Sequence, residues 1–108
     1  MKINDLFSIL KEKAGQASLP QDIEATVQVE LSGADPADWN AQVRDGRVVL
    51  AEGRLETPDL TISAASETAV GLFEKRINPM AAFMTGKIKV KGDVGKAALL
   101  KNLLTGKK

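Results

Sequence analysis

The 108-residue chain contains no cysteine, histidine or tyrosine. Without cysteine no disulfide framework can form, and the redox compartment stays open. Without imidazole, thiol and phenol groups, the chain lacks the side chains that most proton-transfer and nucleophilic mechanisms use. Zinc and copper sites normally need His or Cys as ligands. Catalysis by carboxylates and lysines alone would need a buried pair with shifted pKa values. We expect a protein that is not an enzyme, with no catalytic residues, no cofactor and no metal.

Long apolar runs are missing as well. No run approaches the roughly 18 apolar residues that span a bilayer, and the stretch Met1–Asp5 lacks the apolar segment of a secretory signal. Apolar residues make up 44% of the chain and charged residues 27%, as in ordinary globular proteins. The length suits one core. We expect a single cytoplasmic domain over residues 1–108.

The charges are unevenly distributed although the net charge is only +1. Residues 1–54 carry six Lys/Arg and nine Asp/Glu, whereas residues 75–108 carry nine Lys/Arg and one acid. A basic segment of this kind is either a solvated face balanced by acids elsewhere or a surface that attracts phosphates. Its lone aromatic, Phe83, lies in an apolar run, so no stacking platform for nucleic acid is evident.

The first half of the chain changes from helical to strand periodicity. Apolar residues recur at helical spacing from Ile3 to Ala14, with Asn4-Asp5 able to cap the start and Gly15 expected to end the helix. From Ala25 onward, alternation with a period of two predicts half-buried strands. The dipeptide Asp45-Gly46 fits a two-residue hairpin turn, because such turns need positive φ at both central positions.

The second half adds two strands and three helices. Asn78-Pro79 predicts a sharp helix start. Three lysines alternate with two apolar residues in Lys87–Lys91, a pattern that suits the edge of a sheet. The order of elements predicts an α+β fold in which helices cover one face of a largely antiparallel sheet. The expected elements are a helix over 3–15, strands over 25–31, 39–44, 47–51 and 59–63, helices from Ser66 and over 79–84, a strand over 87–91 and a helix over 94–104.

Two helices carry more apolar surface than one sheet face needs. The segment Met80–Met84 has five apolar residues in succession, and the leucines of 94–104 are not confined to one stripe. Three interpretations are open: the helices pack on the sheet and on each other, they form a homodimer interface, or they enclose a lipid. Methionine in such a segment suits a surface that must adapt.

Blocks of sequence along nearly the whole chain resemble the sterol carrier protein type 2 family. Asp38-Trp39, Asp45-Gly46, Glu52-Gly53 and Pro58–Ile62 are similar to successive blocks of that domain. The strongest similarity is Ile77–Asp93, which contains Asn-Pro followed by Phe-x-x-Gly-Lys-x-Lys-x-x-Gly. The resemblance implies a five-stranded, mostly antiparallel sheet covered on one face by helices and enclosing an apolar tunnel. It also implies non-catalytic binding and transfer of fatty acids, fatty acyl-CoA, phospholipids or sterol-like lipids.

Carried over to this sequence, the resemblance implies a set of ligand-binding residues. For each of them, plain core packing is the competing interpretation. The set is Trp39, Val43, Phe73, Ile77, Met80, Phe83, Met84, Leu100, Leu103 and Leu104.

The resemblance also bears on partners and location. We expect a lipid or fatty acyl ligand, transient contact of segment 75–108 with anionic membranes, no nucleic acid, and a monomer or a weak homodimer. Thr85 stands where animal members often have Gln, which leaves the preference for a head group open. The sequence does not end in a Ser-Lys-Leu-like tripeptide, which favours a cytoplasmic location over a peroxisomal one. The alternative function is an accessory module whose apolar groove docks a partner protein or a second copy.

Overall fold

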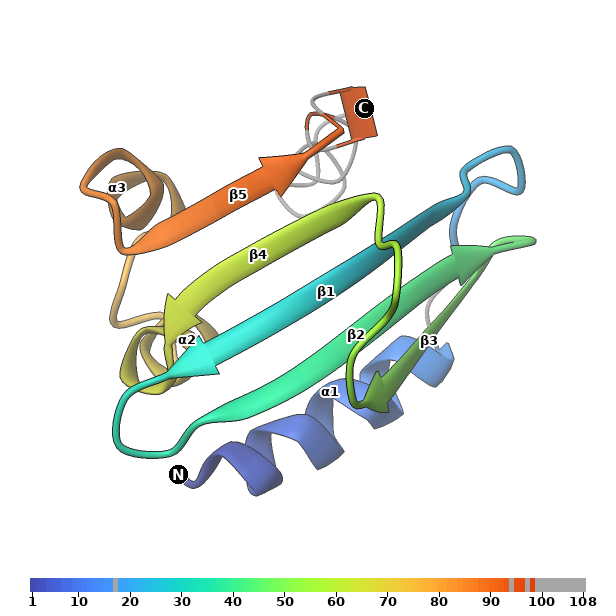
Figure 1. Ribbon diagram of the computed structural model, residues 1–108. Helices are drawn as coiled ribbons and strands as arrows, with labels where there is room; N and C mark the ends of the chain where they lie inside the picture. Colours follow the sequence, from blue (N-terminus) through green and yellow to red (C-terminus); the bar gives the residue numbers. More distant parts are fainter. Residues whose placement is uncertain (17, 94, 97, 99–108) are drawn as a thin grey trace.

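The computed structural model describes residues 1–16, 18–93, 95, 96 and 98. Figure 1 shows a central sheet with helices at its side and end. The predicted last helix lies largely outside the described residues. In chain order the elements are α1 (Ile3–Gln16), β1 (Ala25–Ser32), β2 (Ala37–Arg44), β3 (Arg47–Glu52), β4 (Leu60–Ala65), α2 (Ser66–Phe73), α3 (Pro79–Met84) and β5 (Ile88–Gly92).

The five strands form one mixed sheet in the order β3-β2-β1-β4-β5. The first three strands are the predicted antiparallel meander. β4 returns to pair with β1 in parallel, and β5 pairs antiparallel with β4. The expected α+β fold with a mostly antiparallel sheet is therefore confirmed, with β1–β4 as the parallel pair.

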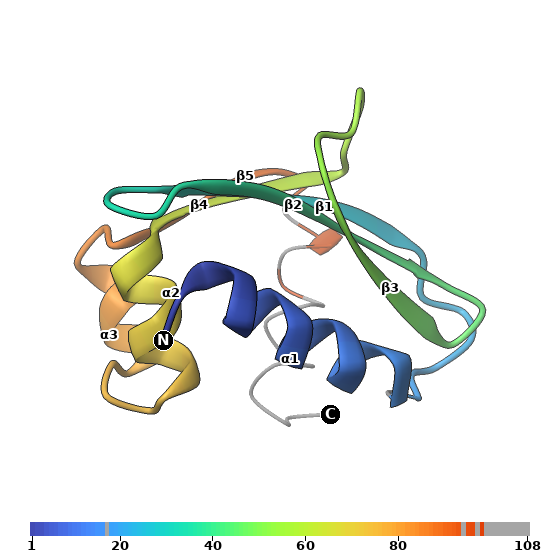
Figure 2. The ribbon, with the colours of Figure 1, turned by 90° about the horizontal axis from the view of Figure 1, so that it is seen from below.

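Helices cover one face of this sheet, as Figure 2 shows for α1, α2 and α3. Strand alternation explains why that face is apolar. The register sets Val29 beside Trp39 on one side and beside Ile62 on the other, so apolar side chains form a continuous row across three strands. The helices bury this face because it carries the core.

The opposite face is polar and is crossed by the segment 53–59 that connects β3 to β4 (Figures 1 and 2). Gln28 is 2% exposed beneath it. The Gln28 amide nitrogen donates to the carbonyl oxygens of Trp39 (3.0 Å) and Gly53 (3.2 Å), and its Oε1 accepts from the Leu55 N–H (2.7 Å). A buried amide is tolerated because both of its ends are hydrogen-bonded.

A surface ion pair ties the same segment to the sheet. The Arg54 guanidinium donates to the carboxylates of Glu30 and Asp38. The hydrogen bond from Arg54 lowers the pKa of Glu30, with a smaller contribution from the Ser63 hydroxyl. Since all of these side chains are solvated, we assign them a role in positioning the segment 53–59 and little net stability.

Local turn and cap chemistry follows the sequence at two places. Asp45 and Gly46 have φ of 53° and 78°, as the predicted two-residue hairpin requires. Asn78 caps α3: its side chain accepts from the backbone N–H groups of Met80 (2.9 Å) and Ala81 (3.2 Å). Both predictions are confirmed.

The start of α1 differs from the prediction. The helix begins at Ile3, one residue before the expected cap at Asn4. The Ile3 N–H donates instead to the Asp35 carboxylate (2.8 Å), which lies in the β1–β2 connection. A residue distant in sequence thus satisfies a free N–H of the first turn. At the other end, the helix continues one residue past Gly15 to Gln16.

β5 lies at the edge of the sheet, as its lysines predicted. Lys89 and Lys91 are exposed, whereas Ile88 and Val90 are half-buried. A row of charges on an edge strand disfavours pairing with a strand of another molecule.

Candidate ligand-binding site

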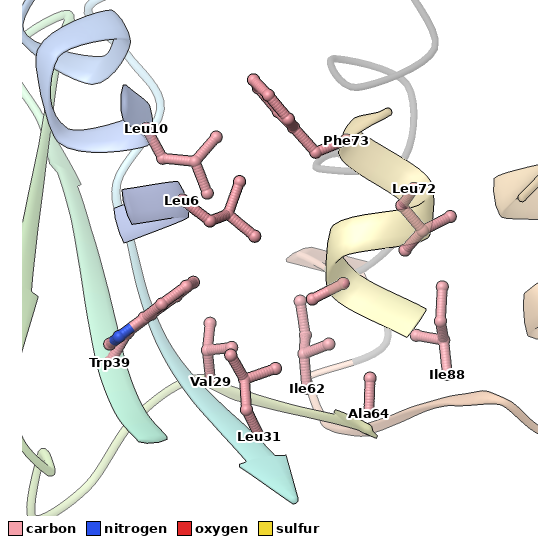
Figure 3. A pocket seen from close by; sticks show the side chains of 11 residues that line it. Leu6, Leu10, Val29, Leu31, Trp39, Ile62, Ala64, Leu72, Phe73 and Ile88 are labelled. Atoms are coloured by element: carbon pink, nitrogen blue, oxygen red, sulfur yellow. The ribbon is translucent and has the colours of Figure 1, made fainter. Parts of the chain in front are cut away.

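A cavity of about 320 Å³ lies between the sheet and the helices (Figure 3). Among the described residues, every side chain that lines it is apolar. The walls come from α1, α2 and four of the strands. The lining residues are Leu6, Leu10, Val29, Leu31, Trp39, Ile62, Ala64, Ala69, Leu72, Phe73 and Ile88. We call this space the apolar cavity.

The size and chemistry of the apolar cavity suit a hydrophobic ligand. Its volume is roughly twice that of an apolar cavity of about 150 Å³ that binds benzene, and it lies at the lower end of the usual range for ligand pockets, roughly 300–1,000 Å³. Because the described lining is apolar, this part of the wall can recognise length and shape but offers no polar anchor for a head group.

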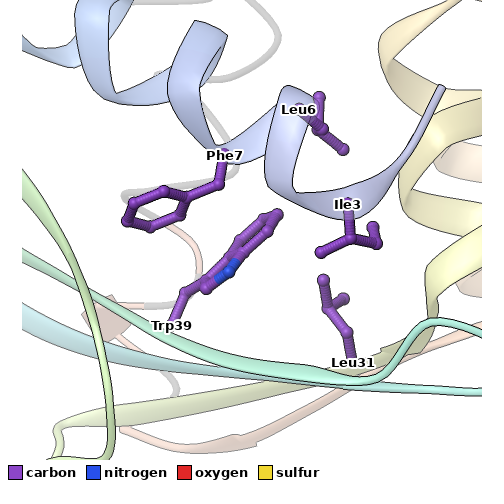
Figure 4. Close-up of a cluster of buried hydrophobic side chains, with 5 residues drawn as sticks. All are labelled: Ile3, Leu6, Phe7, Leu31 and Trp39. Carbon is purple, nitrogen blue, oxygen red and sulfur yellow. The ribbon is translucent and has the colours of Figure 1, made fainter.

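Trp39 forms one wall of the apolar cavity and also belongs to the main core (Figure 4). It is 5% exposed, and its ring centre lies 5.1 Å from that of Phe7, with the planes tilted by 48°. Ile3, Leu6 and Leu31 complete this buried cluster. The cluster fixes α1 on the sheet, and α1 in turn directs Leu6 and Leu10 toward the cavity (Figure 3).

The β1–β2 connection ties together the two helices that line the apolar cavity. Its Asp35 accepts from the Ile3 N–H at the start of α1, and the Asp35 N–H donates to the Ser66 hydroxyl at the start of α2 (3.3 Å). The Ala34 N–H donates to Glu67 (3.1 Å), which lowers the pKa of that carboxyl. The starts of α1 and α2, two walls of the cavity, are therefore both hydrogen-bonded to the β1–β2 connection.

An ion pair lies where β4 begins. The Lys96 ammonium donates to the Asp59 carboxylate (3.0 Å), and the same carboxylate accepts from the Thr26 N–H (2.9 Å). The hydrogen bond from Lys96 lowers the pKa of Asp59, and that from Thr26 adds to the effect. This contact joins the residues that follow β5 to the start of β4.

Two of the sequence-predicted ligand-binding residues line the apolar cavity. They are Trp39 on β2 and Phe73 at the end of α2. Val43 also faces the helical side of β2, but it packs with Ile23 and Ala25 in a second buried cluster away from the cavity. Its contact with a ligand stays a prediction.

The other predicted residues lie away from the cavity lining or outside the described residues. Ile77 is half-buried, and its side chain occupies the space beside Gly71. A Cβ added at Gly71 would lie 2.4 Å from the Cδ1 atom of Ile77. Met80, Phe83 and Met84 are 45%, 53% and 78% exposed. Their role in ligand binding also stays a prediction. Leu100, Leu103 and Leu104 lie outside the described residues.

Nine lining residues were absent from the sequence-predicted set. The helical period of α1 and the alternation in the strands predict burial for several of them, including Leu6, Val29 and Ile88. That signal indicates burial and does not distinguish a cavity wall from a packed core. The nine are Leu6, Leu10, Val29, Leu31, Ile62, Ala64, Ala69, Leu72 and Ile88.

The described part of the chain shows no group of three or more His, Cys, Asp or Glu side chains placed to hold a metal ion. Within the same residues, no helix is long and apolar enough to cross a membrane.

Known proteins are similar to this chain over almost its whole length. It is 31% identical to hydroxysteroid dehydrogenase-like protein 2 of Rattus norvegicus, over 95% of this chain and 20% of that protein. It is 34% identical to sterol carrier protein 2 of Gallus gallus, over 66% of this chain and 13% of that protein. The chain thus spans about a fifth or less of the length of these relatives.

Solved structures share the fold. The palmitated SCP2L2 of Aedes aegypti superposes with a TM-score of 0.80 at 22% identity, covering 95% of this chain and 94% of that one. The sterol carrier protein domain 2 of Helicoverpa armigera gives a TM-score of 0.73 at 25% identity, over 92% and 82% of the two chains.

A family model matches nearly the whole chain. The model of the SCP-2 sterol transfer family matches residues 3–105. The match includes the strands, the helices and the residues that line the apolar cavity. The fold of this family supports the binding of hydrophobic ligands. This chain belongs to the SCP-2 sterol transfer family.

Proposed function

We propose that this protein binds and transfers lipids with a single aliphatic chain, such as fatty acids and fatty acyl groups, in the cytoplasm and without catalysis. The observation that carries the proposal is the apolar cavity of about 320 Å³, whose lining within the described part of the chain consists of apolar side chains. A cavity of this size favours one extended chain over a two-chain phospholipid or a rigid sterol. The palmitated SCP2L2 of Aedes aegypti, which shares the fold, supports the same class of ligand.

The energetics suit reversible binding. Burying the fifteen apolar carbons of palmitate gains at most about 12 kcal/mol, at about 0.8 kcal/mol for each carbon. Association costs at least about 4 kcal/mol. The remainder is at most about 8 kcal/mol, which corresponds to a dissociation constant of about 1 μM or weaker. A transfer protein must release its ligand, and the apolar wall formed by the described residues allows that release.

Trp39 provides the test, because it is the single tryptophan and it lines the apolar cavity. We expect palmitate to change the Trp39 emission with a saturable, one-site dependence. Native mass spectrometry of protein purified without detergent should detect one aliphatic lipid on the chain. An unchanged emission spectrum together with a bare chain in the mass spectrum would contradict the proposal.

A second candidate is an accessory module that docks a partner protein or a second copy. The exposed Met80, Phe83 and Met84 favour it, and so does the small share of the longer relatives that the chain spans. This function predicts a concentration-dependent dimer, or a complex, whose formation buries these side chains while palmitate leaves the Trp39 emission unchanged. Analytical ultracentrifugation at several protein concentrations separates the two candidates.

A further inference from the structure

Helix α3 turns its largest apolar side chains toward solvent. Met80, Phe83 and Met84 are 45%, 53% and 78% exposed. Positions three and four apart share one face of a helix, so these three side chains form a single stripe. Ala82 projects from the opposite side of the helix and is 1% exposed. α3 therefore packs on the protein through a small residue and presents its bulky apolar face outward. We call Met80, Phe83 and Met84 the α3 stripe.

The other two helices of the described structure use their apolar faces differently. In α1, Ile3, Leu6 and Phe7 are buried against the sheet. In α2, Leu72 and Phe73 are half-buried and line the apolar cavity. The apolar faces of these two helices are thus already occupied within the chain. Of the five large apolar residues that are exposed in the described part of the chain, three belong to the α3 stripe.

Basic residues flank α3 at both ends. Residues 75–92 contain five Lys/Arg and no acid. Lys75 and Arg76 precede the helix; Arg76 forms an ion pair with Glu74, and Lys75 is exposed. Lys87 follows the helix and is exposed, and its N–H donates to the Ala82 carbonyl oxygen (2.8 Å), which holds it at the end of α3. An apolar stripe between two cations is complementary to an anionic membrane, which has negatively charged head groups above an apolar interior.

We propose that α3 docks the protein on anionic lipid bilayers, with the α3 stripe inserted among the acyl chains and Lys75 and Lys87 against the head groups. The inference rests on the proposed function, since a lipid transfer protein must meet a membrane. A second copy of this chain fits less well, because a two-fold contact through α3 would set its flanking lysines against those of the other copy. The methionines suit an irregular lipid surface, because their side chains are flexible and polarizable.

The position of α3 connects docking to ligand exchange. α3 lies between α2 and β5 in the chain, and Figure 1 shows α2 and α3 at the end of the sheet where β5 begins. Leu72 of α2 and Ile88 of β5 both line the apolar cavity. Docking through α3 thus brings the walls of the cavity to the membrane surface.

Site-specific fluorescence tests the insertion. The chain has no cysteine, so Met84→Cys and Val49→Cys each give a single site for a polarity-sensitive label. Val49 lies on the edge strand β3 and is 58% exposed, which makes it a matched control. We expect the label at 84 to shift to the blue and to brighten with vesicles of phosphatidylcholine and phosphatidylserine, and the label at 49 to stay unchanged. Equal responses at both positions, or none at 84, would overturn the proposal.

Charge substitutions test the orientation. We expect Lys75→Gln and Lys87→Gln each to weaken binding to the same vesicles about fivefold, and Lys13→Gln on α1 to leave it unchanged. Pure phosphatidylcholine vesicles should bind weakly and without dependence on these lysines. An equal loss of vesicle binding in Lys13→Gln would refute docking through α3. So would the finding that Lys75→Gln and Lys87→Gln keep vesicle binding and lose a dimer instead.

The two proposals can fail separately. The lysine variants should keep the palmitate response of Trp39 in solution without vesicles. If they keep it and the vesicle assays fail, only the docking surface is wrong. If palmitate produces no response in the unmodified protein, the proposed function itself is wrong.

Discussion

Filling the apolar cavity should weaken ligand binding and strengthen the ligand-free fold at the same time. Ala64 on β4 projects into the cavity (Figure 3), and its partners across the sheet are Leu31 and Ile88. The change Ala64→Leu adds three carbons where the ligand would lie. If they displace three ligand methylenes, the loss is about 2.4 kcal/mol, at about 0.8 kcal/mol each. We therefore expect the affinity for palmitate to fall about sixtyfold.

The same three carbons become buried in the protein itself. The cavity of about 320 Å³ has room for them, so we expect the free energy of unfolding of the ligand-free protein to rise by up to about 2 kcal/mol. Trp39 emission measures the affinity, and urea denaturation without ligand measures the stability. The opposite signs separate this effect from simple damage to the fold, which would lower both quantities.

Ala51→Leu on β3 is the matched control. Its cross-strand partner is Asn40, so Ala51 lies on the sheet face opposite the apolar cavity. We expect this variant to keep the affinity of the unmodified protein for palmitate. If Ala64→Leu has a higher free energy of unfolding and an unchanged affinity for palmitate, the ligand binds elsewhere. If its free energy of unfolding is lower, the space beside Ala64 is already filled.

Three further predictions concern the scaffold. Gln28→Leu should lower the free energy of unfolding by about 2–3 kcal/mol in urea denaturation, because two backbone carbonyls and one N–H lose their buried partner. Gly92→Ala should prevent folding or lower the melting temperature by several degrees, because φ is +115° and a Cβ would lie 2.2 Å from the Asp59 carbonyl oxygen; circular dichroism will show an unchanged melting temperature if this is wrong. Asp59→Asn should reduce stability at neutral pH and leave it unchanged in strong acid. The contact with Lys96 lowers the pKa of Asp59 below its ordinary value of 3.8, so the carboxylate stabilises the fold above that pH and loses this effect as the pH falls through the folded-state pKa. Identical melting curves of the two proteins at pH 7 would contradict this prediction.

The elements that the sequence predicts well are those determined by neighbouring residues. The hairpin at Asp45-Gly46 depends on two adjacent backbone conformations, and the start of α3 depends on one side chain, Asn78, that reaches the next turn. The edge position of β5 follows from its alternating lysines. In each case the physical cause lies within a few residues, so the sequence is sufficient to predict it.

Contacts between distant segments were not predictable in the same way. Nothing in the sequence near Ile3 indicates that Asp35 accepts from its N–H. The parallel pairing of β4 with β1 depends on the whole crossover and on Gln28, which holds the segment 53–59 against the sheet. Helix starts and strand order of this kind depend on tertiary structure, which local patterns do not encode.

The candidate site was predictable in its chemistry and only partly in its residues. The excess of apolar surface in Met80–Met84 was evident from the sequence, and the structure places it on the solvent side of α3 because small Ala82 faces the protein. Trp39 and Phe73 were named as cavity residues and do line it. The periodicity of α1 predicts burial of its apolar face, and it does not distinguish a packed interior from the wall of a cavity.

An aliphatic lipid in the apolar cavity would lie against the methyl groups that line it. The most direct measurement is the detection of intermolecular nuclear Overhauser effects between palmitate methylene protons and the methyl groups of the protein. We expect such effects at Val29, Ile62 and Ile88, which line the cavity, and none at Ile23 or Val48 of the second cluster. Effects confined to the second cluster or to the protein surface, with none at the cavity methyl groups, would contradict it.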